Sequence, residues 1–134
     1  MKKHLFDVQD TTILVSSAGT KAFPESPYGT TVETLLELGV DPRKHKQTKL
    51  TKDVALAHDV IVCMAKHHKD FVERFGAKAY LFNELAYDLV TDVADDTETH
   101  EIGVSMTLDQ FIVNTVKHIH EGIPRLHAKV KQLK

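Results

Sequence analysis

Continuous runs of apolar residues divide the chain and predict its strands. The clearest are ILV within residues 12–16, VIVCM at 60–64 and AYLF at 79–82. Runs of this kind are typical of strands that are buried on both faces, as in a parallel sheet. Amphipathic stretches separate the runs, and this alternation predicts an α/β fold with a parallel sheet.

The stretches between the runs carry apolar residues at helical spacing. They predict helices over residues 30–38, 52–58 and 65–75. Gly39 and Gly76 stand where a glycine ends a helix, and Thr51 stands where a hydroxyl caps one. Residues 1–10 predict a last helical turn followed by a loop.

The carboxyl-terminal third of the chain predicts a long loop and then a long helix. Residues 83–100 are acidic and predict a functional loop. An apolar stripe then begins near Ser105 or Thr107 and continues to the end of the chain. We expect Pro124 to kink or restart this helix, because proline cannot donate the backbone hydrogen bond that an inner helical turn requires.

Small side chains end the first apolar run, where residues 16–20 read SSAGT. Small residues at the carboxyl end of a parallel strand allow a ligand or another backbone to come close. We therefore expect the functional end of the domain at this edge of the sheet.

Composition narrows the class of protein. The 134 residues fit a single domain, and a net charge of −2 argues against a nucleic-acid-binding surface. The sequence contains neither an apolar run long enough to span a membrane nor a signal peptide, so we expect no membrane contact. The single cysteine, Cys63, cannot form an internal disulfide, which is compatible with a cytoplasmic location.

The histidines and lysines carry weaker signals. The nine histidines include no pair at metal-ligand spacing on one helix face, so we expect no metal. Lys44, Lys46, Lys49 and Lys52 fit a solvated basic face better than a docking site for a phosphorylated partner.

Four segments together carry a resemblance to a known family. They read SSAGT at 16–20, ELGVDPRKHK at 37–46, TKLTKD at 48–53 and HDVIVCMAKHH at 58–68. In this order they resemble the low-molecular-weight protein tyrosine phosphatases, and the likeness runs from residue 12 to the end. It implies a three-layer α/β/α fold, no metal and no organic cofactor. Arsenate reductases share the fold and the SAGT-like stretch, and are an alternative.

The resemblance also implies what the 134 residues lack. The family attacks phosphorus with a cysteine thiolate in a C-x5-R loop that follows its first strand. Here the residue six positions after Cys63 is Lys69, and residues 1–6 resemble the tail of the helix that follows the loop. We therefore expect the amino end to be incomplete, the polypeptide to be inactive as given, and Cys63 to be a buried, inert thiol.

Some site residues are implied by the same resemblance. Asp95, or Asp96 after a shift of one residue, matches the aspartate that protonates the leaving group. Ser17 and His45 match residues that support the phosphate loop, and Phe23 matches an aromatic residue beside the substrate ring. Each residue also has a plain structural interpretation. The aspartates would belong to a solvated acidic loop, and the Ser17 hydroxyl would cap the backbone at the end of a strand. His45 would be a surface histidine, and Phe23 would anchor its loop on the core.

The family sheet has the strand order 2-1-3-4, so an inner strand would be missing. Either residues 12–16 pair directly with 60–64, or another chain or copy fills the gap, or the natural chain is longer. A complete form would act on phosphorylated proteins or small aryl phosphates. The other functional reading is a non-catalytic binding or regulatory domain of the same fold.

Overall fold

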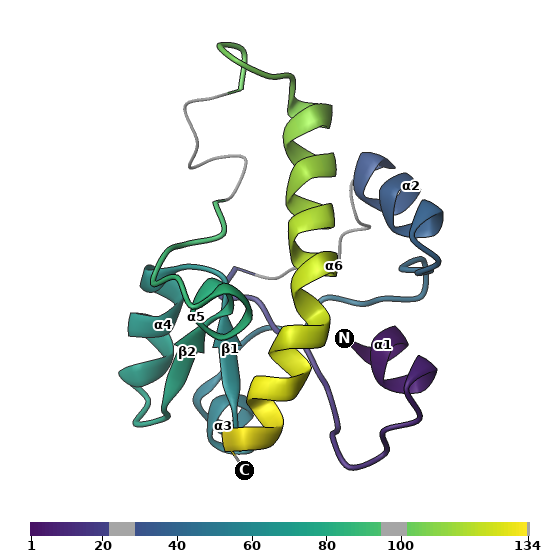
Figure 1. Cartoon of the computed structure of the whole chain (residues 1–134). Helices are drawn as coiled ribbons and strands as arrows, with labels where there is room; N and C mark the ends of the chain where they lie inside the picture. Colours follow the sequence, from purple (N-terminus) through teal and green to yellow (C-terminus); the bar gives the residue numbers. More distant parts are fainter. Residues whose placement is uncertain (22–28, 95–101, 134) are drawn as a thin grey trace.

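The computed structural model describes residues 1–21, 29–94 and 102–133. Its strands, β1 (Ile61–Cys63) and β2 (Ala79–Leu81), pair in parallel, with Ile61 opposite Ala79 and Cys63 opposite Leu81. The helices are α1 (Lys2–Asp7), α2 (Gly29–Glu37), α3 (Lys52–Leu56), α4 (Lys66–Glu73), α5 (Phe82–Tyr87) and α6 (Leu108–Leu133). Figure 1 shows α6 running the length of the molecule beside the strands. The predicted α/β class with a parallel sheet is confirmed.

Several helices begin or end at the residues that the sequence predicted. The Val54 N–H donates to Thr51 Oγ1 over 3.3 Å, so Thr51 caps α3. Gly39 and Gly76 follow α2 and α4 with φ of +80° and +88°, a conformation that glycine adopts without steric cost.

Helix α6 begins with a reciprocal cap and continues across its proline. Gln110 N–H donates to Thr107 Oγ1, and Thr107 N–H donates to Gln110 Oε1, over 3.2 Å and 2.8 Å. The helix then runs through Pro124 without a break, so no restart occurs. Figure 1 shows its carboxyl-terminal part inclined to the upper part. Among the described helices, none is long and apolar enough to cross a membrane.

Residues 82–87 form α5, although the sequence predicted a strand that includes Phe82 and a loop from residue 83 onwards. Phe82, Leu85 and Ala86 are buried at helical spacing, so packing stabilises a helix that is too short to stand alone. Glu84 Oε2 also accepts a hydrogen bond from the Leu81 N–H. The predicted acidic loop therefore starts after Tyr87, and the expectation of a loop from residue 83 is wrong.

Residues 12–16 do not form the predicted strand. Leu14 is 95% exposed, whereas Ile13 packs against the same hydrophobic cluster as Val60 and Val62. Over the described residues, no peptide group from 13 to 18 makes a backbone hydrogen bond. Direct pairing of 12–16 with 60–64 is therefore also wrong, because apolar content alone cannot make a strand without a neighbouring backbone.

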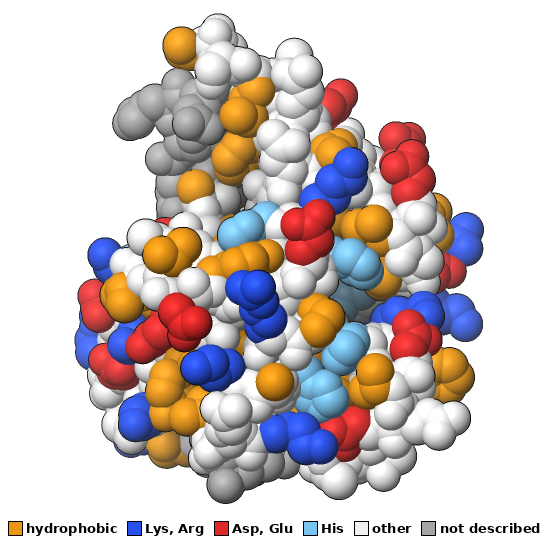
Figure 2. Space-filling model, in the orientation of Figure 1, with side chains coloured by type: hydrophobic (Ala, Val, Ile, Leu, Met, Phe, Trp, Pro, Cys, Tyr) orange, Lys and Arg blue, Asp and Glu red, His pale blue; other side chains and the backbone are white. Residues whose placement is uncertain are grey.

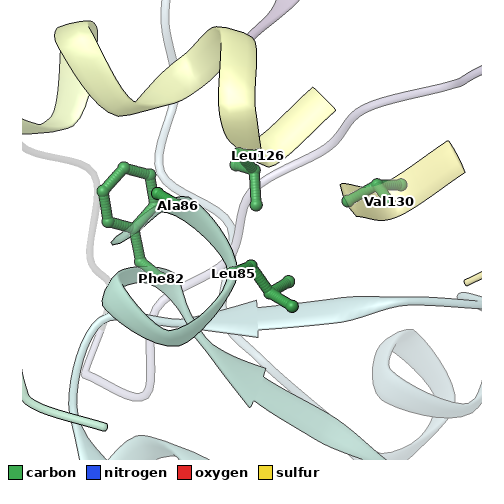
Figure 3. Close-up of a cluster of buried hydrophobic side chains, with 5 residues drawn as sticks. All are labelled: Phe82, Leu85, Ala86, Leu126 and Val130. Carbon is green, nitrogen blue, oxygen red and sulfur yellow. The ribbon is translucent and has the colours of Figure 1, made fainter. Parts of the chain in front are cut away.

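Two hydrophobic clusters lie against the strands. Phe82, Leu85 and Ala86 of α5 meet Leu126 and Val130 of α6 in one of them (Figure 3). The other cluster joins β1 and β2 to α3 and α4, through the following buried residues: Ala55, Cys63, Val72 and Ala79. Helices thus cover the small parallel sheet with two separate cores, as a layered α/β fold requires.

A polar network fastens the amino end to α6. Asp10 Oδ2 accepts hydrogen bonds from His127 Nε2 and Lys131 Nζ, over 2.8 Å and 3.1 Å. The other ring nitrogen of His127 lies 3.1 Å from His4 Nε2 on α1. Hydrogen bonds from Thr12, and then from His127 and Lys131, hold the pKa of Asp10 well below its usual range. Figure 2 shows histidine side chains gathered beside α6 on this face.

Gly122 lets α6 approach α5 closely. A Cβ at this position would lie 2.9 Å from Phe82 Cζ and 3.0 Å from Tyr87 Cε2. We expect Gly122→Ala to lower the free energy of unfolding by about 1–2 kcal/mol, because crowding of the core outweighs the gain in helix propensity. Urea unfolding measures the change, and Glu121→Ala at the adjacent exposed position is the control. Equal or greater stability of Gly122→Ala would contradict this packing.

Candidate functional site

Segment 91–94 lies across the carboxyl end of β1. The Val93 N–H donates to the carbonyl of Met64, the residue after β1, over 2.7 Å. The Lys66 N–H, at the first turn of α4, donates to Asp92 Oδ1 over 2.8 Å. A carboxylate is favourable at this position because helix N-termini carry free N–H groups and a positive dipole end. The N-terminus of α4 is therefore occupied by a side chain of the same protein.

Asn83 holds segment 91–94 from the side of α5. It is only 6% exposed, and its Nδ2 donates to Thr91 Oγ1 and to the Asp92 carbonyl, each over 3.1 Å. Since Nδ2 is the donor, Oδ1 is the acceptor, and it lies 2.6 Å from His118 Nε2 on α6. His118 must therefore carry a proton on Nε2.

Tyr87 fixes the other face of His118. The two rings stack with centroids 4.5 Å apart and an interplanar angle of 22°. The Tyr87 hydroxyl donates to the carbonyl of His118 over 2.6 Å, and burial raises the pKa of this phenol. The polar groups that position segment 91–94 thus come from α5 and α6 together.

A hollow of about 310 Å³ lies beside these groups. Segment 91–94 contributes Asp92, Val93 and Ala94 to its walls, and α6 contributes Phe111, Asn114, Thr115 and His118. Asn83 of α5 and Met106, which precedes α6, complete the lining. Asp95 and Asp96 follow Ala94 directly in the sequence, but both lie outside the described residues. The structure places the residues that lead to the predicted acid, and the acid itself stays a prediction.

The remaining predicted site residues are only partly brought together. Ser17 and His45 are both exposed, and Phe23 lies outside the described residues. Gly19 joins the segment that carries Ser17 to the segment that carries His45. Its N–H donates to the Thr48 carbonyl, and its own carbonyl accepts from the Leu50 N–H. The stretch after residue 16 therefore lies beside the basic loop that carries His45.

Ser16, which the sequence analysis did not single out, makes the closer polar contact. Its Oγ lies 2.6 Å from His58 Nε2, while His58 Nδ1 lies 2.6 Å from the carbonyl of Val54. A carbonyl can only accept, so Nδ1 carries the proton and Nε2 accepts from the Ser16 hydroxyl. This pair fastens the segment after Ile13 to α3.

Cys63 is buried at the end of β1, as predicted. Burial, and secondarily Glu73, raises the pKa of its thiol to about 11. Lys69, six positions on, lies 4.0 Å from Glu73. A protonated thiol beside a helix N-terminus that already holds Asp92 does not form an anion-binding loop.

Sequence reasoning missed Asn83, Asp92 and His118. Asn83 fell within a segment assigned to a loop, and Asp92 looked like one acid among many. His118 follows Phe111 and Thr115 on the inward face of α6, and a polar residue on such a face is the signal that could have identified it.

Removing the Asn83 side chain tests whether it positions this edge. We expect Asn83→Ala to lower the free energy of unfolding by about 2–3 kcal/mol, because the hydrogen bonds to Thr91, Asp92 and His118 are lost together. We also expect faster hydrogen exchange at the Val93 and Lys66 amides. Asn114→Ala, an exposed asparagine, is the control. Unchanged exchange at both amides would contradict the positioning role.

Several solved structures have a fold similar to that of this chain. A mutant of YwlE from Bacillus subtilis matches with TM-score 0.75 and 22% identity, over 96% of this chain and 84% of that one. A low molecular weight protein tyrosine phosphatase from Bacillus subtilis matches with TM-score 0.74 and 21% identity, over 97% and 84%. The tyrosine phosphatase Wzb from Escherichia coli K30, in complex with sulphate, matches with TM-score 0.68 and 19% identity, over 87% and 78%.

Neither protein-family models nor curated protein sequences give a match. The structural likeness nevertheless spans nearly the whole chain and agrees with the four sequence segments described above. The chain therefore has the fold of the low-molecular-weight protein tyrosine phosphatases.

Proposed function

We propose that this chain is the framework of a low-molecular-weight phosphatase, and that the 134-residue polypeptide does not hydrolyse phosphomonoesters by itself. The fold and the four family-like segments support the first part. The burial of Cys63 and the raised pKa of its thiol support the second part. A lone cysteine without a disulfide partner is also in keeping with action in the reducing cytoplasm.

The single observation that carries the proposal of inactivity is the burial of the sole cysteine. With a pKa of about 11, the Cys63 thiol is ionised in about one molecule in ten thousand at pH 7. Phosphoryl transfer to cysteine needs a thiolate and donors around the phosphoryl oxygens. Asp92 already occupies the nearest helix N-terminus, and its negative charge would repel a phosphate there.

In a form that carries a C-x5-R loop, the framework would support the following chemistry. A loop thiolate attacks phosphorus, the bond to the leaving oxygen breaks, and Asp95 or Asp96 gives that oxygen a proton. Water then hydrolyses the cysteinyl phosphate, and the same carboxylate takes up the proton. Asn83 and His118 fix the backbone that leads to this acid. Ser17 and His45 support the loop, Phe23 flanks an aryl group, and no metal takes part.

Fusing a strand and a C-x5-R loop to the amino end tests the proposal. The segment is taken from the Bacillus subtilis low molecular weight phosphatase that shares the fold. We expect no hydrolysis of p-nitrophenyl phosphate above background for the chain alone, and turnover for the fusion. Asp95→Asn or Asp96→Asn in the fusion should lower turnover by about 10²–10³-fold, because general acid catalysis is lost.

Replacing the loop cysteine by serine is the control for the fusion. Activity of the unfused chain that disappears in Cys63→Ser would overturn the proposal of inactivity. A folded but inactive fusion would favour the alternative, a non-catalytic binding domain of the same fold. Phosphoarginine is assayed in parallel, since two of the similar structures are arginine phosphatases; a preference for it would replace aryl phosphates as the substrate class.

Alkylation of Cys63 tests its protonation directly. We expect iodoacetamide to modify the native chain at least about tenfold more slowly than the urea-unfolded chain at the same pH, because the thiol is buried and protonated. The native rate should still be rising at pH 10, in line with a pKa of about 11. A rate that levels off between pH 5 and 7 would identify a low-pKa nucleophile instead.

A further inference from the structure

Helix α1 has little hydrophobic contact with the rest of the molecule. It has six residues, which is too few for a helix to persist without tertiary contacts. Leu5 is its buried residue, whereas the neighbouring Phe6 is 81% exposed. The attachment of α1 therefore depends strongly on the polar contact between His4 and His127 of α6.

The turn after α1 brings Asp10 into the same contact and fixes the protons on the rings. The Asp10 N–H donates to the carbonyl of Leu5 over 2.9 Å, so Asp10 is held against α1. Its carboxylate accepts a hydrogen bond from His127 Nε2 over 2.8 Å. Nε2 therefore carries a proton, and a neutral His127 has an unprotonated Nδ1. This nitrogen accepts from His4 Nε2 over 3.1 Å.

The two rings together accommodate one additional proton but not two. With one, His127 donates from both nitrogens, the His4 proton moves to its own Nδ1, and Asp10 balances the charge. With two, both rings are imidazolium ions, and an N–H of each faces the other over 3.1 Å. The hydrogen bond is then lost, and two positive charges repel each other across the contact.

The groups around His4 also disfavour its protonation. Burial, followed by the positive charges of His127 and of the Met1 amino group, lowers the pKa of His4, and Asp7 opposes them to a smaller extent. Asp7 is itself paired with Lys3 over 2.6 Å. The attached helix therefore favours a neutral His4.

Asp10 does not offset a second proton, because its charge is already shared. Lys131 Nζ lies 3.1 Å from the Oδ2 that accepts from His127. Hydrogen bonds from Thr12, and then from His127 and Lys131, keep the pKa of Asp10 far below that of either histidine. The carboxylate thus stays ionised in mildly acidic solution, and the histidines are the groups that change charge there.

We propose that the contact between His4 and His127 is a pH-dependent latch, which holds α1 on α6 near neutral pH and releases it in mildly acidic solution. A released histidine takes up its proton with an ordinary pKa of about 6.5, whereas the attached His4 resists protonation. The attachment is therefore complete above this pH and weakens as the pH falls, by up to about tenfold per pH unit for one proton. The latch is a property of the fold and does not depend on the proposed function.

Hydrogen exchange measured by NMR tests the latch. The reporters are the amides of Val8, Gln9 and Asp10, whose hydrogen bonds close the end of α1. After correction for the intrinsic effect of pH on exchange, we expect their protection to fall at least about fivefold between about pH 6.5 and 5, while the amides of α5 stay protected. Constant protection of the reporters, or an equal loss at α5, would overturn the latch.

His4→Gln removes the titration and keeps the hydrogen bond. The glutamine amide can donate to His127 Nδ1 as the imidazole does, but it takes up no proton in this range. We expect protection like that of the parent near neutral pH and less than about a twofold change at lower pH. His120→Gln, which changes an exposed histidine of α6, is the matched control and should keep the parent's pH dependence. Persistence of that dependence in His4→Gln, or its loss in His120→Gln, would overturn the inference.

The imidazole signals of the parent chain give an independent measurement. We expect His4 and His127 to titrate as a coupled pair in two steps, with the second step at the pH where the α1 amides lose protection. Replacement of His4 by glutamine should leave a single step for His127. Independent titration of both rings near pH 6.5, without a matching change at α1, would overturn the latch.

Discussion

The close contact between α5 and α6 is the constraint on which the rest of the structure depends. Gly122 has no side chain, so the ring of Phe82 rests almost against the backbone of α6. Phe82 is 1% exposed, and the same contact buries Leu85, Ala86, Leu126 and Val130. Burying an aromatic ring of this size contributes several kcal/mol, which exceeds what a helix as short as α5 could supply by itself.

The same contact determines the geometry of the candidate site. Asn83 lies on α5 and His118 on α6, and they meet over 2.6 Å only because the two helices pack closely. Asn83 then fixes Thr91 and the Asp92 carbonyl, and Asp92 caps α4. Hydrophobic packing on one side of the sheet thus sets the position of polar groups at its carboxyl end. A shift of α6 by one helical turn would separate His118 from Asn83 and release the segment that leads to Asp95 and Asp96.

The fold and the catalytic chemistry of this protein rest on different residues. The fold of a phosphatase is present over nearly the whole chain, yet the one cysteine is buried and protonated, and the helix N-terminus beside it is filled by Asp92. A scaffold of this kind can position an acid and supporting hydroxyls, but an anion site also needs a thiolate and free N–H donors at one place. Lys69 cannot replace an arginine there, because an ammonium group cannot grip a phosphate with two parallel hydrogen bonds.

The sequence by itself determined the features that depend on near neighbours in the chain. The sequence predicted the cap at Thr51, the turns at Gly39 and Gly76, strands within 60–64 and 79–81, and the burial of Cys63, because each rests on local conformation or on a continuous apolar run. Tertiary structure alone decided the rest. Helix α5 forms because α6 covers Phe82, and Asn83 gains its role from His118, thirty-five positions away. Within the described part of the chain, residues 13–18 have no paired strand. Such contacts join residues that are distant in sequence, and a one-dimensional pattern does not encode which distant partner will arrive.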